Sequence, residues 1–86
     1  MKIFKFRLQV TDTQSIMVPG GAEIVSVQFH DDALFAWAKV DPDAPEVSKT
    51  IRIAGTGHEL GDDDMKYHAT VLDPDRFHVW HVFEIL

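Results

Sequence analysis

Residues 23–40 have the sequence EIVSVQFHDDALFAWAKV, from which the fold class can be predicted. Its first half predicts a strand in which Val25, Val27 and Phe29 share one face, because alternation of apolar and polar residues is typical of a half-buried strand. The two aspartates that follow predict a tight connection to a second strand over residues 34–40. Both faces of this second strand are largely apolar, so we expect a β-hairpin whose second strand is central and well covered.

A period of two continues through most of the remaining chain. It predicts further strands over residues 4–10, 15–18, 49–54, 67–72 and 77–85, separated by segments rich in glycine, proline and aspartate. The best helical candidate is a single turn near residues 62–65. Several short strands at regular spacing predict an all-β fold: a small antiparallel sandwich or barrel-like domain of about six to seven short strands with little or no helix. This pattern leaves the order of the strands open.

The length and composition favour one small cytoplasmic domain. Eighty-six residues leave no room for a second core, so residues 1–86 are expected to form a single β domain. The chain has no cysteine, which excludes a thiolate zinc site and a cysteine nucleophile and is atypical of a small secreted domain. Its first residues alternate in polarity and lack the apolar stretch of a signal peptide. We therefore expect a cytoplasmic protein.

The charge of the chain is acidic. Eight lysine and arginine residues stand against 14 aspartate and glutamate residues, which gives a formal net charge of −6. Negative charge repels phosphates, so neither nucleic acid nor an anionic membrane is an expected partner. The basic residues form no patch along the sequence, although the folded surface could gather some of them. The acidic loops could present a negative surface to a basic partner protein.

The segment GTGH at residues 55–58 is the candidate binding loop. Glycines let the backbone adopt a positive φ, and successive amides in such a turn can bind an anion. Arg52 shares a strand face with Ala54 and Thr56, which would bring its guanidinium beside the loop. If the last strand lies nearby, the candidate ligand-binding residues are Arg52, Gly55, Thr56, Gly57, His58, His81 and Glu84. The alternative interpretation is a strand that ends in a turn requiring glycine.

Neither metal binding nor catalysis is expected. The chain has five histidines, but His78 and His81 are three residues apart in a predicted strand and should point to opposite faces. The three aspartates at residues 62–64 lack the alternating ligands of an EF-hand. No serine lies in a G-x-S-x-G sequence. We therefore predict a protein that is not an enzyme, with no catalytic residues, no metal and no cofactor.

The last predicted strand, residues 77–85, is apolar on both faces. Such a strand has to be central, covered, or paired across a subunit interface, because an open apolar edge aggregates. A chain of 86 residues also buries little surface by itself. Together these observations favour a homo-oligomer, with a dimer as the expected form.

Four stretches carry a family resemblance: IVSVQ at residues 24–28, WAKVDP at 37–42, IRIAGTGH at 51–58 and HVFE at 81–84. They resemble a family of small phage and prophage proteins that carries only a domain-of-unknown-function label. The likeness covers nearly the whole chain, and GTGH and HVFE are its most specific parts. Members typically follow GTGH with proline, whereas Glu59 stands here. The resemblance implies a phage or prophage origin and a location in the cytoplasm of the infected or lysogenic bacterial host, but no activity.

A binding function is the first hypothesis for this chain. Small phage accessory proteins generally act by binding, so we expect a non-catalytic protein that binds a host or phage protein, a defence component or a small anionic ligand. One alternative is a structural or assembly role in the virion. Another is a small enzyme that uses His58 or His81 as a general base.

Overall fold

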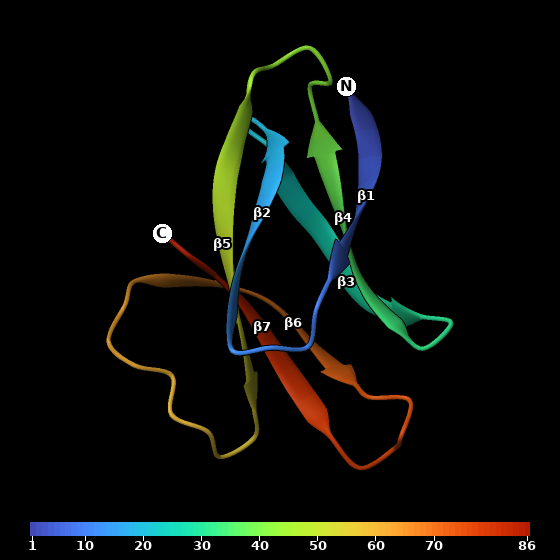
Figure 1. The fold of residues 1–86 in the computed structure, drawn as a ribbon, viewed down its shortest axis with the longest axis vertical. Helices are drawn as coiled ribbons and strands as arrows, with labels where there is room; N and C mark the ends of the chain where they lie inside the picture. The colour runs from blue at the N-terminus through green and yellow to red at the C-terminus, as the bar shows by residue number, and fades with distance from the viewer.

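The computed structural model describes all residues from Met1 to Leu86 and contains seven strands and no helix. The strands are β1 (Lys2–Leu8), β2 (Thr13–Pro19), β3 (Glu23–His30), β4 (Ala33–Val40), β5 (Glu46–Gly55), β6 (Met65–Leu72) and β7 (Val79–Ile85). They form two antiparallel sheets, with strand orders β1-β4-β3 and β2-β5-β7-β6. The two sheets enclose one core in a small sandwich (Figure 1), which confirms the predicted all-β class. The structure contains no helix that could cross a membrane.

The core lies between the two sheets and is made of apolar side chains. From the four-stranded sheet, Ile51, Ile53 and Val82 enter it, each with an exposed fraction of 2% or less. The whole buried cluster consists of Leu8, Val18, Ala22, Ile24, Val27, Leu34, Ala36, Ala38, Val40, Ile51, Ile53 and Val82. Alternate residues of a strand point to the same side, so the period of two in the sequence becomes one buried and one outer face on each sheet.

The hairpin predicted from residues 23–40 is present. β3 pairs with β4, and the turn between them has positive φ at both Asp31 (51°) and Asp32 (68°). Two consecutive residues with positive φ are what a two-residue type I′ turn requires, and aspartate tolerates this conformation better than most residues. β4 is the central strand of its sheet, as the sequence predicts, but it is covered on one face only: on the other face Phe35 and Trp37 are half-buried and Lys39 is exposed.

One predicted face of β3 is wrong. The sequence pattern places Val25 with Val27 and Phe29, but the register shifts between Ile24 and Ser26. The extra residue of this β-bulge reverses the alternation on its N-terminal side. Ile24 is therefore buried, whereas Val25 is 53% exposed. A bulge arises from pairing with the neighbouring strand, so the pattern along one strand does not predict it.

The apolar strand β7 is central in its sheet, between β5 and β6. Both of its edges are paired, so it needs no second subunit to protect them. It begins at Val79, two residues later than predicted. The reason is Asp75, which accepts hydrogen bonds from the backbone N–H groups of Phe77 and His78 and keeps both residues in the preceding turn.

Candidate functional site

The GTGH segment forms a turn at the end of β5. The N–H of His58 donates to the carbonyl of Gly55 at 3.0 Å, and the N–H of Gly55 donates to Nδ1 of the His58 ring at 3.2 Å. Gly57 has a φ of +88°, a conformation that favours glycine. Two of the four amides of the segment therefore have partners within it, which reduces the capacity of this turn to bind an anion.

The contact between the His58 ring and Gly55 can be tested by a pair of substitutions. A Cβ atom at position 55 would lie 2.8 Å from Cε1 of His58, so the ring has to move if a side chain is added. We expect Gly55→Ala to lower the free energy of unfolding by about 1 kcal/mol because of this overpacking. In a His58→Ala background the same change should be nearly neutral. Urea unfolding of both single variants and the double variant measures the coupling. If Gly55→Ala lowers the free energy of unfolding equally in both backgrounds, contact with the His58 ring is not the cause of the loss.

Arg52 lies beside the loop, as predicted, but its guanidinium is held by backbone carbonyls. Nη1 donates to Asp12 at 3.1 Å and to Ile53 at 2.6 Å, and Nη2 donates to Glu59 at 2.6 Å. The side chain is only 13% exposed. Arg52 thus ties the turn between β1 and β2 to the loop after β5. These three hydrogen bonds give the mostly buried Arg52 side chain a structural role.

His81 lies next to the loop, and its hydrogen bonds link β7 to β6 and to the turn after β5. It pairs with Ala54 of β5 in the sheet register. Its Nε2 lies 2.9 Å from Oγ1 of Thr56, and its Nδ1 lies 3.1 Å from Oγ1 of Thr70 on β6. Thr70 in turn hydrogen-bonds with the hydroxyl of Tyr67 at 2.8 Å. The outer face of the sheet therefore carries a continuous polar chain that begins at the GTGH segment.

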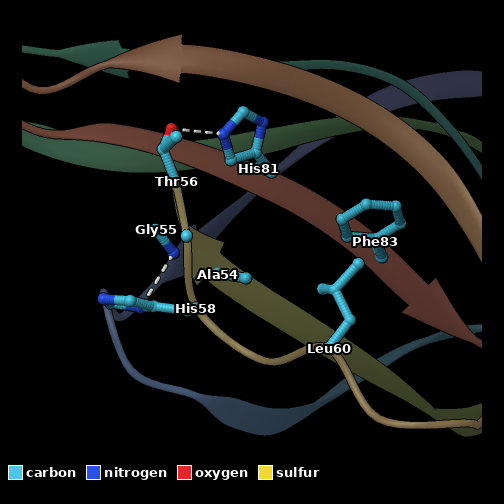
Figure 2. A pocket seen from close by; sticks show the side chains of 8 residues that line it. Ala54, Gly55, Thr56, His58, Leu60, His81 and Phe83 are labelled. Atoms are coloured by element: carbon cyan, nitrogen blue, oxygen red, sulfur yellow. Dashed lines mark hydrogen bonds between the residues drawn. The ribbon is translucent and has the colours of Figure 1, made fainter.

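A hollow lies between the GTGH segment and β7. Its volume is about 270 Å³, and its walls are Ala54, Gly55, Thr56, Gly57, His58, Leu60, His81 and Phe83. Figure 2 shows Leu60 and Phe83 pointing toward each other, with Thr56 and His81 joined by a hydrogen bond farther along. His58 lies against Gly55 on the other side of the loop. Two smaller hollows, of about 220 Å³ and 150 Å³, also include His58 in their walls.

Glu84 is not part of this site. It is three residues after His81 in β7, so it lies on the inner face of the sheet. Its carboxylate is 2.6 Å from Nζ of Lys49 and 3.0 Å from Nε2 of His68. Burial alone would raise the pKa of Glu84, but the hydrogen bonds from Lys49 and His68 hold this pKa below its ordinary value. The same spacing argument that separates His78 from His81 could have excluded Glu84 from the loop.

The turn between β6 and β7 gathers Asp73, Asp75 and His78, whose ligand atoms lie close enough to hold a metal ion. Their oxygens already accept hydrogen bonds: Asp73 from the indole N–H of Trp80 at 2.8 Å, and Asp75 from the backbone of Phe77 at 2.7 Å. Hydrogen bonds to Asp75, from the backbone of Phe77 and from the His78 ring, lower the pKa of this carboxyl, and the same carboxylate raises the pKa of His78. Hydrogen bonds within the turn therefore explain why these three side chains lie close together.

A comparison with protein families gives a match over nearly the whole chain. The model of a family described as a domain of unknown function (DUF7352) matches residues 1–85. This range includes all seven strands and the GTGH segment. No curated protein and no solved structure matches the chain.

Proposed function

This chain belongs to the family DUF7352, a domain of unknown function, and from that premise we propose that it is a non-catalytic binding protein. The proposed contact is a side chain of a partner protein held in the hollow beside the GTGH segment. The proposal depends on one observation, the hollow itself, and on the chemistry of its walls.

The size and lining of the hollow favour a single side chain as its occupant. Its volume of about 270 Å³ is at the lower limit of small-molecule sites, which span about 300–1,000 Å³. Leu60 and Phe83 supply an apolar wall, and Thr56 and His81 supply hydroxyl and imidazole groups beside it. Protein interfaces often draw most of their binding energy from one or two anchoring side chains in pockets of this kind.

Binding is a better account of this chemistry than catalysis. The ring nitrogens of His81 contact the hydroxyls of Thr56 and Thr70, neither of which is a carboxylate that would make the imidazole a stronger base. A partner protein is also favoured over a small anionic ligand. The guanidinium of Arg52, the cation nearest to the loop in sequence, donates to three carbonyl groups within the fold.

The charge around the hollow favours a basic partner. Residues 59–64 contain Glu59 and three consecutive aspartates, and all four acidic residues are exposed. Such a segment attracts a basic surface and speeds the encounter, with an effect that salt screens. The resemblance of the chain to phage and prophage proteins makes a basic protein of a bacterial host the first partner to test.

The proposal predicts that a charge placed in the wall of the hollow weakens partner binding. Leu60 is 39% exposed and lies in a loop, so Leu60→Asp should leave the fold intact. With the chain as bait in host extract, a partner is identified by mass spectrometry and its affinity then measured with purified protein. We expect Leu60→Asp to weaken this affinity at least tenfold, as truncation at an interface anchor does.

The matched control is Leu72→Asp. Leu72 is 60% exposed and lies on β6, in the four-stranded sheet that borders the hollow, but it is not one of the residues that line the hollow. This variant therefore introduces the same charge without changing the site. It should keep wild-type affinity. Equal affinity of the Leu60→Asp and wild-type proteins would contradict the proposal, as would equal losses in both variants.

A further inference from the structure

The outer face of the three-stranded sheet gathers cations around aromatic rings. Lys5 and Arg7 of β1 lie in register with Trp37 and Phe35 of β4. Lys39 lies on the same face of β4, two residues after Trp37. The three cationic residues are exposed and the two aromatic residues are half-buried. We call these five residues the basic-aromatic face.

We propose that the basic-aromatic face binds single-stranded nucleic acid. Proteins that bind single strands stack bases on aromatic rings and pair the phosphates with nearby cations. The face offers both groups side by side, on a sheet surface that no other element of the chain covers. This site is on the other sheet from the hollow, and its argument does not depend on the proposed function.

The geometry of the rings suits adjacent stacking positions. The ring centroids of Phe35 and Trp37 are 6.0 Å apart, with an angle of 52° between their planes. Nζ of Lys5 lies 3.9 Å from the centroid of Phe35 and 5.5 Å from that of Trp37, and Cζ of Arg7 lies 5.9 Å from the Phe35 centroid. Cation–π attraction thus helps to hold both cations at the rings, and Nζ of Lys5 also lies 3.2 Å from Nδ1 of His30. The flexible stem of Lys5 lets its ammonium move from the ring to a phosphate when a base stacks there.

The third strand adds hydrogen-bonding groups on the same face. Ser26 and Gln28 of β3 lie in register with Trp37 and Phe35. Nε2 of Gln28 donates to Oγ of Ser26 at 3.0 Å, and the Gln28 side chain is exposed. Amide and hydroxyl groups beside a stacked base can hydrogen-bond with its edge. An acidic peptide would use the cations but offers no series of planar groups for two adjacent rings, so the observations favour a nucleic acid.

The local charge of the face differs from that of the whole chain. Its three cations stand against two nearby carboxylates: Glu23, which lies in register with Lys39, and Asp31, which lies 3.6 Å from the His30 ring at the edge of the face. The net charge of −6 is a sum over all residues. Charges separated by more than about 8 Å are largely screened at physiological ionic strength, so a ligand on this face responds mainly to the cations beside it. The net charge of the chain predicts that nucleic acid is not a partner, whereas the local charge of this face predicts that it is. Titration with an oligonucleotide distinguishes these two predictions.

The test uses an oligothymidylate of about 12 nucleotides, a length that spans one such platform. Binding is followed by Trp37 fluorescence in a Trp80→Phe background, since a stacked base quenches the indole. We expect quenching at low salt. The plot of log affinity against log salt concentration should have a slope of about −2, because each of three phosphate contacts contributes about −0.7.

Matched charge variants identify the face. Lys5→Gln with Arg7→Gln should weaken binding at least tenfold and flatten the salt slope by about 1.4. Lys66→Gln with Arg76→Gln removes the same charge from exposed positions outside the three-stranded sheet and should change little. Trp37→Phe should retain much of the affinity, whereas Trp37→Leu should lose most of it because no ring remains at this position; these two variants lack the Trp37 signal, so their binding is measured by the anisotropy of a dye-labelled oligonucleotide. Leu60→Asp should bind the oligonucleotide like wild type.

Several results would overturn the proposal. One is the absence of binding at low salt, and another is an equal loss in both double variants, which would indicate net charge alone. Inorganic polyphosphate that binds as tightly as the oligonucleotide would indicate a site for phosphate without bases. A polyglutamate peptide that binds as tightly, with the same dependence on Lys5 and Arg7, would indicate an acidic protein partner.

Discussion

Replacing Glu84 with alanine is expected to lower the free energy of unfolding by about 2–3 kcal/mol. Glu84 accepts hydrogen bonds from Lys49 and His68 on the inner face of the four-stranded sheet. The three side chains are only 14%, 16% and 6% exposed, respectively. Removing the carboxylate leaves an ammonium group without its partner in a poorly hydrated position, and this loss costs more than breaking a surface ion pair. Urea or thermal unfolding measures the effect.

Two controls separate this ion pair from a general charge effect. Glu46→Ala removes an exposed carboxylate from the same sheet and should cost less than about 0.5 kcal/mol. The double variant Lys49→Ala with Glu84→Ala should lose less than the sum of the two single variants, because the second change removes a charge that has already lost its partner. Additive losses would show that the two groups do not stabilise one another.

The same carboxylate gives stability a defined pH dependence. The pKa of Glu84 is lowered in the folded protein, so its contribution is fully present above the pKa of the unfolded chain and is lost as the pH falls through the folded pKa. The stability difference between wild type and Glu84→Gln should therefore shrink as the pH falls from about 6 to about 3. A difference that stays constant over this range would contradict the ionised role of Glu84.

Replacing Ile51 with alanine is expected to cost about 2–5 kcal/mol, the range for truncating a fully buried aliphatic side chain. Ile51 is 0% exposed and belongs to the core cluster. A domain of 86 residues has a total stability of about 4–13 kcal/mol, so the loss is a large part of the whole. Denaturant unfolding should show a lower midpoint with a similar slope.

Val47→Ala is the matched control for this prediction. Val47 lies on the same strand, an even number of residues from Ile51, but it is 45% exposed. Its truncation leaves no closed cavity and should cost about 1 kcal/mol or less. Similar losses at Ile51 and Val47 would mean that the core does not close around Ile51 as the structure describes.

The fold followed closely from the pattern of side chains along each strand. The apolar character of both faces of residues 34–40 predicted a central strand, and Leu34, Ala36, Ala38 and Val40 are all buried as one face of β4. The error at Val25 has a different origin. The bulge in β3 exists only in relation to β4, so its signal is absent from the strand considered by itself.

The candidate site was predicted in part. The loop at residues 55–58 and His81 do meet, because β7 pairs with β5 and brings His81 beside Ala54. Arg52 lies beside the loop with its donors occupied by carbonyl groups, a fact that depends on the positions of Asp12 and Glu59 in the folded chain. Leu60 and Phe83 were not predicted as site residues, since the hollow between them forms only when the loop after β5 folds against β7.

Composition and alternation along the chain were enough to predict the all-β class, the approximate strand positions and the acidic character of this protein, because each depends on neighbouring residues or on a sum over the chain. The tertiary structure alone decided which strands are neighbours. That order put Glu84 beside Lys49 and His68, where the three side chains are mostly buried, and Lys5 and Arg7 beside Phe35 and Trp37 on the surface. Residues far apart in the chain meet only through strand pairing, and many pairings satisfy the same backbone hydrogen bonds and the same alternation.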